Sequence, residues 1–426
     1  MTSPRTTKST LSRPFTEAIY YWGYLNYSFS SNCHSYVLLS SPKDMGGMGR
    51  VRCAILGSRG LVAQRILQRI VNHHWLYPAA VIGSPETAGK YLSDLPWSLD
   101  EKRPPLPEIK VREIGDPVSL AEDLISEGIR VVFSALPDAP AEIAEEVLAS
   151  AGLVVISHSI IHRMKEHVPL VIPEANHSHL QILSFQNQYG EGRLISCSNC
   201  MVVPLAITLS PLNAEIGISG ISISTEQSLS GGGREMLSRK DVGNLQPREI
   251  EGEADSVSSE LLRILGNTNS ARSTKIAIDI DVYCERVDRK HGHLAKVDVI
   301  LERDVSAHEI VQIWSKHTSR AQELDLPSAC QEPIHFVSDP NNVEESRWVG
   351  GETRSPGDDL RAAMAVAVGD IHVSGNKMSF TTVADNTIRG AAGYSVLMAE
   401  LLLAEGMIHD IRHSQTSYLG SIGEGQ

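Results

Sequence analysis

The stretch Val51-Arg-Cys-Ala-Ile-Leu56, followed by Gly57-Ser-Arg-Gly60-Leu-Val-Ala63, decides the fold. Six mostly apolar residues predict a short buried strand, and the two glycines predict a tight turn. Apolar residues then recur with helical spacing as far as Val71. A strand, a glycine turn and a helix in this order are typical of α/β domains in which the backbone approaches a pyrophosphate at the turn.

The alternation of strand and helix continues downstream. We expect strands at 79–82, 131–134 and 153–156, and helices at 119–127 and 141–151. This order predicts a Rossmann-type α/β domain with a doubly wound parallel sheet, which binds its ligand at the carboxyl ends of the strands.

Beyond about residue 200 the alternation loosens. The patterns predict an α+β second domain with strands at 218–227, 275–284 and 294–301, a long helix over 307–324, a loop-like segment at 328–357 and a final apolar helix from Asn386 to Ala404. We expect this last helix to return to the first domain.

These patterns divide the chain into four parts. We expect a disordered or mis-started extension at 1–47, with Met48 as a plausible start, and a flexible tail at 413–426. Residues 48–198 with 386–412 would form the first domain, and 199–385 the second.

The composition restricts the possible functions. The chain has 426 residues, a formal net charge of −13 and no basic run, which disfavours nucleic acid as a partner and favours a small-molecule substrate. No segment has the roughly 18 apolar residues of a membrane helix. Six cysteines are too few for a disulfide scaffold and suit a reducing compartment, so we expect a cytoplasmic protein without a membrane partner.

Cys200 lies between a strand-like segment and an apolar helix, where a helix N-terminus lowers a thiol pKa and makes a nucleophile. Its spacing from Cys197 also admits a redox pair or half a zinc site. No second cysteine pair follows at metal spacing, so we predict no metal. Five histidines between His158 and His179 are more typical of a solvated surface than of a metal cluster.

Two further segments contain candidate site residues. Gln227 precedes the glycine-rich loop Ser228-Leu-Ser-Gly-Gly-Gly233. Gln227 could hold a substrate group, and the loop could admit a nicotinamide ribose or ring. Arg286 precedes His293 by seven residues, and such a pair can bind a carboxylate and transfer a proton. Taken singly, each is more often a surface feature.

Several motifs occur together in one chain: the Gly57 turn, Val132-Phe-Ser-Ala135, Val168-Pro-Leu-Val-Ile-Pro-Glu174, Ser198-Asn-Cys200, Gln227 with its glycine loop, Glu260-Leu-Leu-Arg-Ile-Leu265, Arg286 to His293, Leu326-Pro-Ser328 and Asn386-Thr-Ile-Arg-Gly-Ala-Ala-Gly393. From about Arg50 to Ile408 the chain therefore resembles the aspartate-semialdehyde dehydrogenases, particularly their archaeal and fungal branch.

The resemblance implies a role for each matching residue. Cys200 would form a thioacyl enzyme, His293 would be its acid/base partner, and Gln227 would orient the acyl group. Backbone NH groups near Asn199 and Cys200 would receive the oxyanion. The predicted substrate ligands are Asn199, Arg286 for the α-carboxylate, Glu260 for the ammonium, and Arg163 and Arg263 for phosphate, with Arg263 in place of the family's lysine.

The resemblance also implies NADP as cofactor. Its predicted ligands are Gly57, Ser58, Arg59, Gly60, Leu61, Val62, Ser84, Glu86, Ser134, Ser230, Gly231 and Asn386. Two departures affect cofactor choice. Arg59 crowds the turn, and Glu86 stands near the family's arginine for the 2′-phosphate. A carboxylate there would repel that phosphate and could accept a bond from a ribose 2′-OH, so NAD is possible.

We therefore expect an NAD(P)-dependent enzyme that converts L-aspartyl 4-phosphate reversibly into L-aspartate 4-semialdehyde. One alternative is a divergent paralogue that reduces another acyl phosphate or an acyl-CoA such as malonyl-CoA, although Glu260 and Arg286 favour an amino-acid substrate. Another is a non-catalytic nucleotide-binding homologue. The resemblance further implies a homodimer or homotetramer of an amino-acid biosynthetic enzyme serving lysine, threonine and methionine. It makes 48–198 with 386–412 the NAD(P)-binding domain and 199–385 the catalytic and dimerisation domain.

Overall fold

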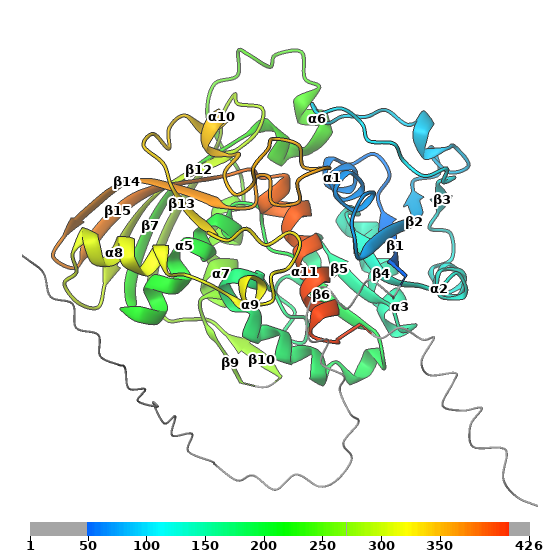
Figure 1. Ribbon diagram of the computed structural model, residues 1–426, viewed down its shortest axis with the longest axis horizontal. Coiled ribbons are helices and arrows are strands. Elements are labelled where there is room, and N and C mark those ends of the chain that lie inside the picture. The colour runs from blue at the N-terminus through cyan, green and yellow to red at the C-terminus, as the bar shows by residue number, and fades with distance from the viewer. Residues whose placement is uncertain (1–48, 270, 409–426) are drawn as a thin grey trace, which may run out of the picture. The chain divides into compact units, whose positions relative to one another are not determined.

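The computed structural model describes residues 49–269 and 271–408, so the predictions for 1–47 and 413–426 lie outside the described residues. Its first sheet has six parallel strands in the order β3-β2-β1-β4-β5-β6 (Figure 1). This confirms the predicted doubly wound parallel sheet. The strands are β1 Val51–Leu56, β2 Leu76–Gly83, β3 Arg112–Glu113, β4 Ile129–Ser134, β5 Val154–Ser157 and β6 Arg193–Ser196.

Alternate residues of β1 enter two different cores, because successive side chains of a strand point to opposite faces. Cys53 and Ile55 pack in the cluster that contains α1 Leu61–Ile70. Ala54 and Leu56 pack in the cluster that contains α2 Pro117–Ser126 and α3 Asp138–Ser150. Both faces of the sheet are therefore covered by helices, which is why its central strands are continuous apolar runs.

The second sheet is mixed and has seven strands in the order β13-β14-β15-β12-β7-β11-β8. Its strands are β7 Ile218–Gln227, β8 Arg248–Glu249, β11 Asp279–Arg286, β12 His293–Leu301, β13 Ile334–Phe336, β14 Val366–Ser374 and β15 Lys377–Ala384. Along β12, buried and exposed residues alternate from Ala295 to Leu301. The inner face packs on α5 Val202–Glu215, α7 Glu253–Ile264 and α8 Ala307–Ser315.

The last apolar segment begins as a π-helix at Ile388–Ala392 and continues as α11 Gly393–Ala404. It lies against α1, where Arg65 Nε donates to Thr387 Oγ1 at 3.1 Å. At the other end, His73 Nε2 and Glu400 Oε1 are 2.8 Å apart and fully buried. The final helix thus packs on α1, the first helix that follows the parallel sheet's first strand.

Two sequence predictions in the second domain were wrong. The helix expected over 307–324 ends at Ser315, and α9 Arg320–Glu323 begins after Ser319. Ser319 and Gln322 form a reciprocal capping box, which satisfies the free backbone groups of a new helix start. The segment expected to be loop at 328–357 contains β13 and the short helix α10 Val343–Ser346.

The remaining elements connect these layers. They are α4 Pro173–Asn176, α6 Gly233–Leu237, β9 Asn267–Asn269, β10 Arg272–Thr274, and short 3-10 turns at Leu92–Asp94, Ile160–His162, His177–Phe185, Asn187–Tyr189 and Leu229–Gly232. Within the described ranges no helix is both long and apolar enough to cross a membrane.

Candidate active site

Cys200 lies in the turn between β6 and α5, and its Sγ is 3.2 Å from Nε2 of His293, the first residue of β12. The π-helix presses against the other side of the cysteine. A Cβ on Gly390 would lie 2.9 Å from both the Cβ and the carbonyl oxygen of Cys200. The Cys-His pair predicted from the resemblance is therefore brought together, and a glycine is required beside it.

The resting pair is neutral. Burial, with the nearby Glu253 carboxylate, raises the pKa of the Cys200 thiol to about 12, while Arg286 and Arg163 act in the opposite direction. Burial, with Arg286 and Arg289, holds the pKa of His293 well below its usual range. A thiolate therefore forms only as the sulfur reacts, when a proton can move along the short contact with His293.

Ser228 provides partners for either tautomer of His293. Its backbone N–H donates to Nδ1 at 3.1 Å, which leaves the ring proton on Nε2, facing the sulfur. Its hydroxyl lies 3.2 Å from Nδ1 and can accept a hydrogen bond from that nitrogen when it is protonated. The hydroxyl also donates to Asn386 Oδ1 at 3.1 Å. The ring can thus act as an acid and as a base.

Glu260 accepts three hydrogen bonds from the protein. One oxygen accepts from Arg163 Nη1 at 2.9 Å. The other accepts from Ser198 Oγ at 2.8 Å and from the Asn199 backbone N–H at 2.7 Å. The side chain is buried, so this carboxylate holds the turn that carries Cys200. Because Glu260 occupies the Asn199 amide, only the Cys200 amide remains of the two expected oxyanion donors.

The two predicted phosphate ligands, Arg163 and Arg263, differ in how many guanidinium N–H groups remain to bind a phosphate. Arg163 uses three of the five guanidinium N–H groups, on Glu260 and on the carbonyls of Cys197 and His158, so two remain. Arg263 is buried, and its Nε, Nη1 and Nη2 all donate, to Ser273 Oγ and to the carbonyls of Arg163, Lys165 and Val168. Arg163 is therefore the better placed of the two, and Arg263 holds its loop.

Three more predicted site residues lie around the Cys200–His293 pair: Arg286, Gln227 and Asn199. Arg286 Nη1 donates to the Ser228 carbonyl at 2.7 Å, and a Cβ on Gly231 would lie 2.6 Å from that nitrogen and 3.0 Å from the His293 ring. Gln227 Nε2 and Asn199 Nδ2 both donate to Glu253 Oε1 at 2.9 Å.

The sequence reasoning missed Glu253. A signal was present, because Glu253 and Glu260 are seven residues apart on α7 and two helical turns place them on one face. Ser228 was missed as well, although it follows Gln227 in the glycine-rich loop.

A cavity of about 710 Å³ lies at the carboxyl ends of the first sheet. Its wall includes Gly57, Ser58, Arg59, Gly60 and Ser84. Gly57 has a φ of +106°, and a Cβ there would approach the Ala135 carbonyl to 3.0 Å, whereas a Cβ on Gly60 would meet open space. This bare backbone at the start of α1 fits the diphosphate of a dinucleotide.

The other predicted cofactor ligands lie outside the wall of this cavity. Leu61 is buried, Val62 is partly buried against the core, and Ser134 is buried at the end of β4. Ser230 and Asn386 exchange hydrogen bonds beside His293, with Gly231 next to them. Glu86 forms an exposed ion pair of 2.6 Å with Arg59.

The structure also shows where the five histidines of the possible metal cluster and Cys197 of the possible redox or zinc pair lie. The expectation of five surface histidines was wrong for two of them, because His162 and His179 are buried, His162 next to Glu145 at 2.8 Å. Cys197 is free and fully buried, and burial raises its pKa to about 12. Among the described residues no three His, Cys, Asp or Glu side chains are grouped to hold a metal.

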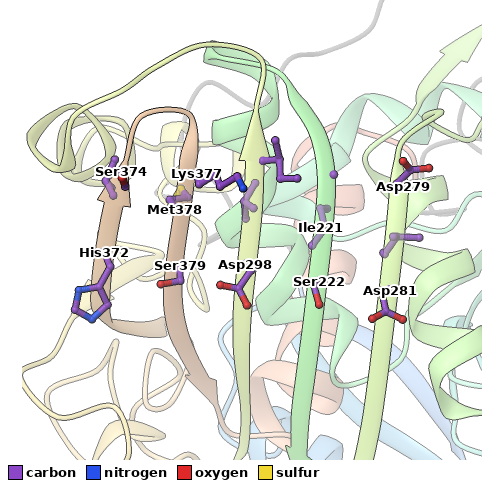
Figure 2. Close-up of a pocket in the computed structure, with 15 residues that line it drawn as sticks. Ile221, Ser222, Asp279, Asp281, Asp298, His372, Ser374, Lys377, Met378 and Ser379 are labelled. Atoms are coloured by element: carbon purple, nitrogen blue, oxygen red, sulfur yellow. The ribbon is translucent and has the colours of Figure 1, made fainter.

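A second cavity, of about 620 Å³, lies on the outer face of the seven-stranded sheet. Its side chains project from β7, β11, β12, β14 and β15, which are neighbours in the sheet (Figure 2). They include Asp281, Asp298, His372 and Lys377, and none of the predicted site residues.

Comparisons with known proteins agree with this geometry. Residues 52–183 match the family model "Semialdehyde dehydrogenase, NAD binding domain". An aspartate-semialdehyde dehydrogenase from Archaeoglobus fulgidus is 30% identical over 363 residues, 84% of this chain and all of the relative. The chain belongs to the aspartate-semialdehyde dehydrogenase family. As predicted, it is an NAD(P)-dependent oxidoreductase, and its archaeal and fungal relatives confirm the predicted branch.

Two more similarities bear on substrate and cofactor. A malonyl CoA reductase (NADP) from Metallosphaera sedula is 29% identical over 84% of this chain and 98% of its own. The solved aspartate semialdehyde dehydrogenase with NADP from Candida albicans is 26% identical, with a TM-score of 0.70 over 84% of this chain and all of that chain.

Proposed function

We propose that the protein catalyses the reversible, NADP-dependent conversion of L-aspartyl 4-phosphate into L-aspartate 4-semialdehyde and phosphate, through a thioacyl intermediate on Cys200. The observation that carries the proposal is the 3.2 Å contact between Cys200 Sγ and His293 Nε2. The side chains of Arg286 and Gln227 and the free N–H groups of Arg163 surround this pair. They supply a cation for a carboxylate, an amide for an acyl oxygen and donors for a phosphate.

Each step uses residues of this chain. Cys200 Sγ bonds to the acyl carbon while its proton passes to His293, and the C–O bond to phosphate breaks, with the phosphate held by Arg163. NADPH, when bound, supplies the hydride that reduces the thioacyl group. Breaking the C–S bond then releases the aldehyde, and the proton on His293 balances the sulfur.

We propose NADP as the preferred cofactor, with NAD as a weaker one. Support comes from the NADP named for the Candida albicans structure and for the Metallosphaera sedula relative. The Glu86 carboxylate repels a 2′-phosphate, but Arg59 neutralises that carboxylate while the two side chains are paired. Arg59 can also turn from Glu86 to the phosphate, because Glu86 is exposed and the Arg59 side chain is 34% exposed.

A malonyl-CoA reductase activity is the second candidate, favoured by the Metallosphaera sedula relative. Glu260 already accepts hydrogen bonds from Arg163, Ser198 and Asn199, so a substrate ammonium would share this carboxylate with Arg163. Comparing turnover of aspartate semialdehyde with reduction of malonyl-CoA decides between the two candidates.

We also propose that the outer face of the seven-stranded sheet joins two copies in a homodimer, with a homotetramer as the other assembly. This face presents both acids, such as Asp281 and Asp298, and bases, Lys377 and His372, so it can complement itself (Figure 2). Sedimentation should show a dimer for the wild type and a monomer for Asp298→Lys.

The four-part domain division and the cytoplasmic location stay predictions.

The proposed reaction is tested by phosphate-dependent reduction of NADP and of NAD with aspartate semialdehyde. We expect turnover with NADP for the intact chain and none for Cys200→Ala. Absence of turnover with either nucleotide, or undiminished turnover by Cys200→Ala, would contradict the proposal.

A further inference from the structure

The wall of the nucleotide cavity comes from two distant parts of the chain. Most of it follows strands of the first sheet: the Gly57 turn after β1, residues 83–85 at the end of β2, and residues 135–137 after β4. The rest is the segment 232–235, in which the glycine-rich loop ends and α6 begins. A side chain of α6 can therefore contribute to what the cavity binds.

Two arginines, Arg59 and Arg234, lie in this wall, and they differ in what they already contact. Arg59 pairs with Glu86 at 2.6 Å. The backbone carbonyl of Arg234 accepts a hydrogen bond from Ser238 Oγ at 2.9 Å, at the end of α6. Its guanidinium has no hydrogen bond or ion pair with any residue that the structure describes. All five N–H groups of Arg234 are therefore left for a ligand.

Arg234 is also partly withdrawn from water. It is half-buried, whereas Glu235 beside it and Glu113 of the same wall are exposed. Neither carboxylate forms an ion pair with it. Moving a cation partly out of water without a counter-ion is unfavourable, and an anion bound in the cavity would compensate for that cost.

The charge of the whole chain gives such a cation a purpose. The formal net charge is −13, and NAD and NADP are polyanions, so the long-range field of the protein opposes their entry. Arg59 adds little local positive charge while it is paired with Glu86. Arg234 is the arginine of this wall whose charge is not already neutralised by an ion pair.

The neighbours of Arg234 indicate which phosphate it meets. Gly231, three residues earlier, lies against the catalytic pair, because a Cβ there would be 3.0 Å from the His293 ring. The nicotinamide has to reach that pair, so α6 borders the nicotinamide half of the nucleotide. The Gly57 turn fits the diphosphate, and Glu86 is expected at the ribose that carries the 2′-phosphate. The diphosphate is thus the phosphate group nearer to Arg234.

We propose that Arg234 binds the diphosphate of the nucleotide, together with the bare backbone of the Gly57 turn. This inference rests on the proposed use of a nicotinamide nucleotide and adds a residue that sets the affinity for it. A guanidinium can bind two phosphate oxygens at once. Because the diphosphate is common to NAD and NADP, Arg234 contributes equally to both, whereas Arg59 and Glu86 choose between them.

The test measures dissociation constants of nucleotides for the full chain without substrate, by isothermal titration calorimetry, so no turnover is needed. Arg234→Gln removes the charge and keeps a polar side chain. Loss of a charge-assisted hydrogen bond at a half-buried site predicts that Kd rises about tenfold for NADP and for NAD. ADP, which carries a diphosphate, should weaken alike. Adenosine 2′-monophosphate, whose phosphate is on the ribose 2′ carbon, should bind as before.

Two variants and one further measurement serve as controls. Arg239→Gln changes an exposed arginine five residues later, which donates to Asp241 at 2.8 Å and lies outside the cavity wall. It should leave every Kd within about twofold of the wild type, as exposed substitutions do. Arg234→Lys keeps the charge and should retain most of the affinity. Without nucleotide, Arg234→Gln should melt at the wild-type temperature, and a clearly lower one would make Arg234 structural and overturn the inference.

The outcomes separate this inference from the proposed function. A Kd that rises for NADP and for adenosine 2′-monophosphate but not for NAD would move Arg234 to the 2′-phosphate and overturn the inference. Constants that stay unchanged for all four nucleotides would overturn it as well, and neither result affects the proposed reaction. Arg234-dependent binding of both dinucleotides, without turnover of aspartate semialdehyde, would support the inference and contradict the proposed reaction. If the wild type binds neither dinucleotide, both fail.

Discussion

The catalytic centre and the nucleotide-binding turn differ in how firmly their side chains are held. Around Cys200, Glu260 and Asn386 are buried, and each makes several hydrogen bonds within the protein. At the nucleotide turn, Arg59 and Glu86 form one exposed ion pair. The first region can tolerate little change without losing geometry, whereas the second can alter its charges at little cost to the fold.

The largest effect is expected for Glu260→Gln. The change leaves the buried Arg163 without its carboxylate and weakens the bonds to Ser198 and Asn199. We expect a loss of about 3 kcal/mol in the free energy of unfolding, typical of a broken buried ion pair, measured by urea denaturation. Glu251→Gln is the matched control and should stay within about 0.5 kcal/mol of the wild type, as exposed substitutions usually do. Equal stabilities of the two variants would show that Glu260 does not hold the turn.

Gly390→Ala tests the close packing behind the nucleophile. The added methyl group would lie 2.9 Å from the Cys200 Cβ, so the cysteine must move away from His293. A displacement of this kind costs about a hundredfold in kcat/KM. Nucleotide binding, followed by fluorescence, should stay near the wild-type value and serves as the control. An alanine variant with full activity would mean that the π-helix does not position Cys200.

The pH dependence of alkylation tests the neutral state of the resting pair. Burial and Glu253 raise the pKa of Cys200 to about 12. Below that pKa the thiolate fraction grows tenfold with each pH unit, so the iodoacetamide rate on the cofactor-free enzyme should rise about tenfold per unit from pH 7 to pH 10. Cys200→Ala identifies the site that is labelled. A plateau below pH 9 would indicate a thiolate already present at neutral pH.

The smallest effect is expected at the nucleotide turn. Glu86→Ser removes the carboxylate and releases Arg59 for a 2′-phosphate. We expect kcat/KM for NADP relative to NAD to rise about threefold to tenfold, and less at high salt, because both partners are exposed. An unchanged ratio would place the 2′-phosphate away from this pair. Glu86→Asp, which keeps the charge, is the control and should stay closer to the wild type.

The first domain was predictable because its signals are local. The run 51–56 and the glycine turn are contiguous, and periodicity predicted the following strands to within a few residues. The break at 316–319 also had a local signal, since Ser319-Arg-Ala-Gln322 has the spacing of a capping box. That signal was outweighed by the apolar residues on either side.

The active site was only partly predictable, because its contacts join distant segments. Cys200 and His293 are 93 residues apart in the chain; Cys200 follows a strand of the first sheet and His293 begins a strand of the second, so only the resemblance paired them. Glu260 shows the limits of the resemblance. A role carried over from the family could not reveal that Arg163, Ser198 and Asn199 already occupy this carboxylate, because that depends on packing. Glu253 was missed although its spacing of seven residues from Glu260 on α7 is a local signal.

The central claim is a covalent thioacyl intermediate on Cys200, and trapping it is the most direct test. The enzyme is mixed with aspartate semialdehyde and NADP without phosphate, quenched in acid, digested and analysed by mass spectrometry. Without phosphate the acyl group cannot leave as acyl phosphate, so the peptide containing Cys200 should gain the mass of one aspartyl acyl group. The same peptide, left unmodified while one equivalent of NADPH is formed, would contradict the account.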